Sequence, residues 1–235
     1  MEAQVAVSKI NKYASSESGD TVEVIERPNG GLSVVMADGQ SSGRGAKAIS
    51  NLVVRKVISL LSEGVRDGAA ARAASDSLFT ARGGKVSATL NIFSIDMQTS
   101  TLVITRNNPA PVLLSQGGQI TSLAEMSQPI GLYRDTRPLI SEVPLEIGLT
   151  ALMYTDGLVH AGSHFGDSLD VAECLEAFLE DEEPSPQVIA DSILAQALQL
   201  DQGRPVDDIS VVILRVSSFQ GDAVRRLTVR LPIFP

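Results

Sequence analysis

Two hydrophobic periods follow each other in blocks along this chain of 235 residues, and their order limits the folds that it can adopt. Alternation with a period of two, or a short continuous apolar run, predicts a strand, whereas a period of 3.6 predicts an amphipathic helix. The strand patterns cover residues 3–10, 21–26, 32–37, 86–96, 101–106, 112–115, 119–123, 137–144, 150–154, 209–216 and 224–231. The helix patterns cover residues 43–63, 67–82, 169–180 and 185–200. Groups of strands therefore alternate with pairs of helices.

This grouping favours an α+β fold over one in which each strand is followed by a helix. We expect a four-layer αββα sandwich, in which two mostly antiparallel sheets pack face to face and a helix pair covers the outer face of each. Residues 209–216 form a nearly continuous apolar run, which is typical of a strand buried on both faces. No linker, repeat or low-complexity tract interrupts the pattern, so we expect residues 1–235 to form one domain.

The composition narrows the classes of function. A net charge of -9 and an isoelectric point near 4.7 argue against a protein that binds the phosphate backbone of nucleic acids. No stretch reaches the roughly 20 apolar residues that a membrane helix needs. Cys174 is the single cysteine, which excludes an intramolecular disulfide and favours a reducing cytoplasm. Because Cys174 lies in an apolar helical run, we expect a packing residue rather than a nucleophile.

Acidic residues mark the ends of several predicted strands. The four positions are Asp20, Asp38, Asp156 and the neighbouring pair Asp207 and Asp208. A lone Asp-Gly pair more often forms a turn, but four acidic positions at the ends of core strands are harder to explain as turns. Carboxylates that converge without a neighbouring lysine or arginine need a cation, and a set of oxygen ligands suits Mg²⁺ or Mn²⁺.

Six short motifs along the chain carry a resemblance to a known family. In order, they are Ser18-Gly19-Asp20, Ala37-Asp38-Gly39-Gln40-Ser41-Ser42-Gly43, Ser87-Ala88-Thr89-Leu90, Pro129-Ile130-Gly131, Tyr154-Thr155-Asp156-Gly157-Leu158 and Asp207-Asp208-Ile209-Ser210. Over residues 3–216 the chain resembles the type-2C, metal-dependent (PPM) serine/threonine phosphatases, in the bacterial branch typified by the stage II sporulation phosphatase. Residues 217–235 would form a C-terminal extension with an extra strand.

The resemblance implies an αββα sandwich with two Mn²⁺ or Mg²⁺ ions at one edge. Asp38 would bridge the ions, the Gly39 carbonyl would help to hold one, and Asp156 and Asp207 would hold the other. Asp20 would join the site through a metal or a coordinated water. The two ions would activate a water for direct attack on phosphoserine or phosphothreonine, with Asp38, Asp156 and Asp207 as the catalytic set.

Asp208 is a sixth candidate ligand. Consecutive strand residues point to opposite faces, so we expect Asp207 rather than Asp208 to face the metals.

Three basic residues have competing interpretations. Arg44 could grip phosphate, but a solvated residue at the helix start is the favoured interpretation. His160 and His164 lie near the third acidic motif, where one of them could act as a general acid, although we favour a solvated loop.

Alternative functions are a catalytically weak or silent binding module, and a two-metal nuclease, which the acidic charge opposes. By analogy with the family, the partner would be a phosphorylated regulator of the STAS kind in bacterial stress signalling. Neither a nucleic acid nor a membrane is expected as a partner.

Overall fold

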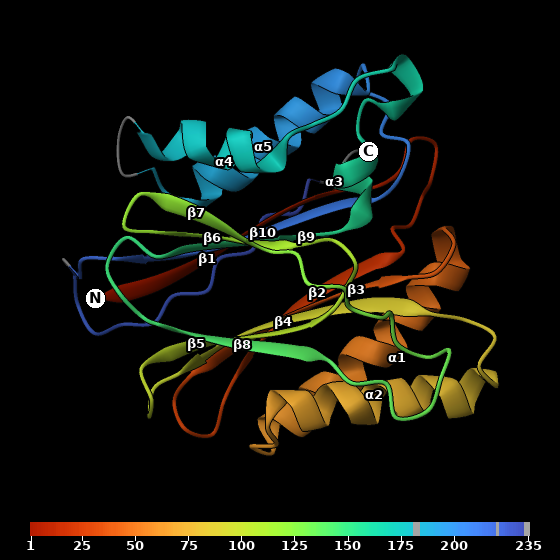
Figure 1. The fold of residues 1–235 in the computed structure, drawn as a ribbon, viewed down its shortest axis with the longest axis horizontal. Helices are drawn as coiled ribbons and strands as arrows, with labels where there is room; N and C mark the ends of the chain where they lie inside the picture. The colour runs from red at the N-terminus through yellow and green to blue at the C-terminus, as the bar shows by residue number, and fades with distance from the viewer. Residues whose placement is uncertain (181–183, 220, 233–235) are drawn as a thin grey trace.

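The computed structural model describes residues 1–180, 184–219 and 221–232, and they form the predicted four layers (Figure 1). Sheet A has the strand order β1-β10-β9-β6-β7, and sheet B has the order β2-β3-β4-β5-β8. All pairs within the two sheets are antiparallel. The α+β sandwich expected from the sequence is confirmed.

The elements follow the hydrophobic periods closely. The strands of sheet A are β1 (Glu2–Ile10), β10 (Ile209–Ser217), β9 (Thr150–Tyr154), β6 (Val112–Gln116) and β7 (Gln119–Leu123). The strands of sheet B are β2 (Asp20–Glu26), β3 (Leu32–Gly39), β4 (Ala88–Asp96), β5 (Thr101–Asn107) and β8 (Leu139–Pro144). The helices are α1 (Gly43–Ser62), α2 (Asp67–Arg82), α3 (Asp156–His160), α4 (Val171–Glu180) and α5 (Pro186–Leu200), with a 3-10 turn η1 (Ser163–Phe165).

Three apolar layers hold the sandwich together. One layer lies between the two sheets and includes Val34, Phe93 and Val212. The helices α1 and α2 pack on the outer face of sheet B, and α4 and α5 pack on the outer face of sheet A (Figure 1). Because successive strand residues point to opposite faces, Val34 enters the central layer and Val35 enters the outer one. Both faces of the inner strands are thus apolar, which explains their continuous hydrophobic runs.

Two expectations about local structure were wrong. Residues 224–231 alternate apolar and polar side chains, yet they form no strand, and Val224, Leu227, Val229 and Leu231 are exposed. Alternation describes the faces of a strand but supplies no partner edge, and this segment instead contacts the protein through Arg225, whose guanidinium donates to the Gly30 carbonyl at 2.8 Å. The segment after Tyr154, expected as a loop, begins with helix α3. Residues 220 and 233–235 of the C-terminal extension lie outside the described part of the chain.

Within the described residues, no helix combines the length and the apolar character that crossing a membrane requires.

Candidate metal centre

The acidic residues reach the same edge of the sandwich from both sheets. Asp20 begins β2 and Asp38 lies near the end of β3, and the antiparallel register places these two residues directly opposite each other. From sheet A, Asp156 begins α3 two residues after the end of β9, and Asp207 lies two residues before β10. The site therefore joins the two halves of the sandwich.

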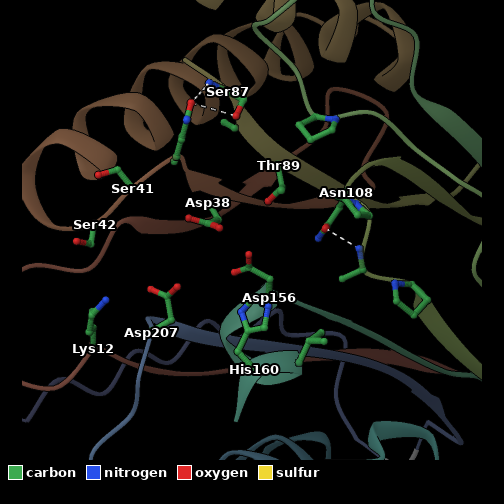
Figure 2. A pocket seen from close by; sticks show the side chains of 18 residues that line it. Lys12, Asp38, Ser41, Ser42, Ser87, Thr89, Asn108, Asp156, His160 and Asp207 are labelled. Carbon is green, nitrogen blue, oxygen red and sulfur yellow. Dashed lines mark hydrogen bonds between the residues drawn. The ribbon is translucent and has the colours of Figure 1, made fainter. Parts of the chain in front are cut away.

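A cavity of about 730 Å³ opens at this edge. Figure 2 shows the carboxylates of Asp38, Asp156 and Asp207 directed toward a shared space. Lys12 lies at one end of the cavity, beside Asp207, and Asn108 lies at the opposite end. The cavity thus combines an acidic floor with a cationic side chain at its rim.

Asp20 is the most deeply buried of these carboxylates, at 1% exposure. Its Oδ2 accepts hydrogen bonds from the Thr155 hydroxyl at 3.0 Å and the Ser210 hydroxyl at 2.6 Å. The Ser210 amide donates in turn to the Thr155 hydroxyl oxygen at 2.9 Å, which fixes that hydroxyl as a donor to Asp20. Oδ1 of Asp20 is buried without a hydrogen-bond partner among the described residues. Burial raises the pKa of Asp20 to about 6.

Mutual repulsion adds to burial at the neighbouring carboxylates. Burial, followed by the negative charges of Asp20, Asp156 and Asp207, raises the pKa of Asp38 to about 9. Burial and the charge of Asp207 also raise the pKa of Asp156. Carboxylates in this state accept a divalent cation readily, because the cation supplies the missing positive charge. The buried orphan oxygen of Asp20 and the oxygen-rich donor set fit Mg²⁺ or Mn²⁺.

His160 joins this cluster, against the interpretation of a solvated loop. It is the last residue of α3, and one ligand atom from each of Asp156, His160 and Asp207 lies within 4.8 Å of the others. Its side chain is exposed, so it faces the open side of the cavity. His164 lies in η1, outside the cavity lining. The structure therefore separates the two histidines, which the sequence could not do.

The neighbours Asp207 and Asp208 have different environments. Asp207 lines the cavity. Asp208 is 4% exposed, and its two carboxylate oxygens accept from the backbone amides of Lys12 at 2.9 Å and Gly19 at 2.8 Å. Asp208 thus fastens the segment between β1 and β2. We keep Asp207 as a candidate ligand and assign Asp208 to the support of the loop that carries Lys12.

Two glycines follow the acidic residues for a packing reason. A Cβ atom at Gly39 would lie 2.1 Å from the Ala46 carbonyl oxygen, and one at Gly157 would lie 2.1 Å from the Asp208 carbonyl oxygen. Any side chain would therefore displace the backbone. Close backbone packing at the site therefore requires the glycine of each Asp-Gly pair.

The sequence patterns did not predict that three lysines lie near the site. The ammonium groups of Lys9 and Lys47 donate to the Asp20 carbonyl at 2.6 and 2.7 Å, so the premise that no lysine lies nearby was wrong. Burial, and then the charge of Lys47, lower the pKa of Lys9. Lys12 lines the cavity itself, although no periodic signal marks it. Arg44, with its side chain 93% exposed and 3.7 Å from Glu17, is the solvated residue at the helix start that the favoured interpretation described.

Comparison with known proteins identifies the family of the chain. A family model described as "Stage II sporulation protein E (SpoIIE)" matches residues 28–217, so the chain belongs to the SpoIIE family of PPM-type serine/threonine phosphatases. Stage II sporulation protein E of Bacillus subtilis (strain 168) is 22% identical over 200 residues, which make up 85% of this chain and 24% of that protein. The chain thus spans about a quarter of the length of this relative.

Solved structures confirm the fold. The PP2C phosphatase domain of SpoIIE from Bacillus subtilis, solved with a fragment of its regulatory domain, superposes with a TM-score of 0.78 at 20% identity, over 94% of this chain and 64% of that one. RsbX in complex with magnesium gives a TM-score of 0.70 at 17% identity, over 92% and 96% of the two chains. The catalytic domain of PstP in complex with two manganese ions gives 0.67 at 16% identity, over 92% and 99%.

Proposed function

We propose that this chain is a metal-dependent phosphatase that hydrolyses phosphoserine or phosphothreonine on a partner protein. The observation that carries the proposal is the convergence of Asp20, Asp38, Asp156 and Asp207 at one edge, where burial and repulsion raise the pKa values of the first three and Oδ1 of Asp20 has no hydrogen-bond partner among the described residues. Two Mn²⁺ or Mg²⁺ ions bound there would supply an activated water and would stabilise charge on the phosphoryl oxygens. The reaction would need no nucleophile from the protein.

The acidic residues that would hold the ions come from the edges of both sheets. We assign Asp38 and the Gly39 carbonyl to one ion, and Asp156 and Asp207 to the other, with Asp38 shared. Asp20 supports the site from beneath, because Thr155 and Ser210 hold one of its oxygens and leave the other free. These hydrogen bonds keep the Asp20 carboxylate from rotating away from the cluster.

Lys12 is the cation that we assign to the phosphate. It lines the cavity beside Asp207, and Figure 2 shows its amine at the edge of the open space. The backbone amide of Lys12 is held by Asp208, so the side chain starts from a fixed point. A lysine ammonium offers three donors to phosphate oxygens. This role replaces the one considered for Arg44.

The opposite wall of the cavity is rigid, which suits the positioning of a phosphorylated side chain. Asn108 donates through Nδ2 to the Tyr154 carbonyl at 3.2 Å and accepts through Oδ1 from the Ala110 amide at 2.9 Å. The buried guanidinium of Arg106 donates to the carbonyls of Asn108 and Ala110, at 3.0 and 3.4 Å. Four charged or amide contacts thus hold the Asn108–Ala110 turn in place before substrate arrives.

For the partner, we propose a phosphorylated signalling regulator of the STAS kind in the bacterial cytoplasm. The support is family membership, and a more exact partner has to come from capture experiments. An Asp38→Ala variant that binds but does not release the phosphoprotein would serve as the bait.

The test is phosphate release from para-nitrophenyl phosphate and from a phosphoserine protein after chelation and return of Mn²⁺. We expect turnover only with the metal present, and none from Asp38→Ala. The exposed residue Glu142 on β8 provides a matched control, because Glu142→Gln also removes one negative charge. Undiminished turnover in excess chelator would refute the metal mechanism. Metal binding without turnover of either substrate would favour the silent binding module.

A further inference from the structure

Helix α3 places a nitrogen ligand beside the acidic residues. Asp156 is its first residue and His160 its last, and residues four positions apart lie on the same face of a helix. Asp207 approaches the same space from the segment before β10, as Figure 2 shows. The three side chains offer ligand atoms that lie within 4.8 Å of one another.

These separations are close to those of ligands on a shared ion. Nitrogen and oxygen ligands lie about 2.0–2.2 Å from a bound transition metal, so two of them are at most about 4.4 Å apart. The imidazole of His160 is exposed, so its side chain is not fixed by burial in the core. The set therefore needs little rearrangement to close around one ion.

A separate observation shows that the surroundings call for a cation. Asp20, 1% exposed and opposite Asp38 in the sheet, keeps Oδ1 buried without a hydrogen-bond partner in the described part of the chain. A buried carboxylate oxygen of this kind is costly unless a donor or a cation contacts it directly, and the ammonium groups of Lys9 and Lys47 donate instead to the Asp20 backbone carbonyl. The cluster that His160 joins is thus a cation site on evidence that does not involve His160.

We propose that His160 is a metal ligand and that, with Asp156 and Asp207, it makes this position selective for a transition-metal ion over Mg²⁺. The inference rests on the metal centre of the proposed function and adds its selectivity. Mg²⁺ is a hard ion that takes oxygen ligands, whereas imidazole nitrogen binds first-row transition metals better. Among the two ions considered for this site, His160 therefore favours Mn²⁺, and Co²⁺ binds more tightly still.

The experiment measures binding of the metals alone to the chelated protein by titration calorimetry, with Mn²⁺ and Mg²⁺ in parallel. We expect His160→Asn to weaken Mn²⁺ binding about tenfold and to change Mg²⁺ binding by less than about twofold, as loss of one nitrogen contact implies. His160→Glu supplies an oxygen ligand in place of the nitrogen. It should bring the two affinities closer together by strengthening Mg²⁺ binding. His164→Asn, the only other histidine in the chain, is the matched control and should leave both affinities unchanged.

A second measurement needs no variant. Pulsed electron paramagnetic resonance of the Mn²⁺-loaded wild-type protein should show coupling to a directly bound ¹⁴N nucleus, and His160→Asn should remove it. Absence of this coupling, or an unchanged ratio of Mn²⁺ to Mg²⁺ affinity in His160→Asn, overturns the assignment. Neither readout requires phosphate release, so a failure of the phosphatase proposal would be visible as lost turnover with the nitrogen coupling intact.

Discussion

Substitution of Asp38 by asparagine should make the metal-free protein more stable at neutral pH. Burial and three neighbouring carboxylates raise the pKa of Asp38 to about 9, against about 3.9 in an unfolded chain. At pH 7 the folded protein therefore holds a proton that the unfolded chain has released. At 1.36 kcal/mol per pKa unit, the roughly three units between 3.9 and 7 lower the free energy of unfolding by up to about 4 kcal/mol.

The sign of the pH dependence follows from the raised pKa. The contribution of Asp38 to stability is fully present below pH 4 and is lost as the pH rises toward 9. The wild-type apoprotein should thus lose stability steadily between pH 5 and 8.5. Asp38→Asn should lose much less, because the amide resembles the neutral carboxyl group and has no proton to release.

Urea unfolding in excess chelator, at several pH values, measures this difference. We expect the two proteins to be nearly equal at pH 4 and Asp38→Asn to be more stable at pH 8, with the order reversed when Mn²⁺ is returned. Glu142→Gln, the control for loss of one charge, should follow the wild type. A wild-type apoprotein whose stability is flat across this range would refute the reasoning, since it would mean that Asp38 is ionised without cost.

The remaining predictions concern single residues. Asp207→Asn should remove most metal-dependent turnover at unchanged stability, whereas Asp208→Asn should keep a sizeable fraction of turnover but lose about 1.5–3 kcal/mol of stability, because its charged oxygens accept two backbone amides. Paired rate and urea measurements separate these outcomes, and the reverse pattern would show that the assignments are exchanged. Lys12→Ala should raise KM for a phosphoprotein about tenfold with a smaller effect on kcat, and an unchanged KM would remove Lys12 from the phosphate site. Cys174→Ser should leave the rate unchanged, because the thiol donates to Gln196 away from the cavity; a large drop in rate at equal stability would restore the nucleophile hypothesis.

The sequence predicted the layers well because both sheets obey a local rule. Strand residues such as Val34 and Val35 alternate between two apolar layers, and the helix patterns match α1 and α2 almost residue by residue. The pairing of β1 with β10 could not be read from the sequence, because register between distant strands depends on the assembled sheet.

The acidic positions were predictable for a related reason. Asp38 lies one residue before the end of buried strand β3, and Asp156 lies two residues after the end of buried strand β9. A carboxylate in such a position needs a partner or a cation. Lys12 and His160 carry no such signal. The position of Lys12 depends on the loop that Asp208 fastens, and α3 has five residues, too few for a helical period to emerge. Residues 224–231 show the opposite case, since a clear alternation of apolar and polar residues pairs with no strand in the structure.

The pairing of β1 with β10 also has a consequence for the time at which the site forms during synthesis. Ile10 pairs with Ile209 and Glu2 with Ser217, so β1 has no neighbour in its sheet until β10 has been made. Until β10 has left the ribosome, Asp20 lacks the Ser210 hydroxyl and the cavity lacks Asp207. Sheet B, whose strands all precede residue 145, can assemble earlier with Asp20 and Asp38. A nascent chain therefore carries half of the candidate metal centre, and β10 completes both sheet A and the acidic cluster in one step.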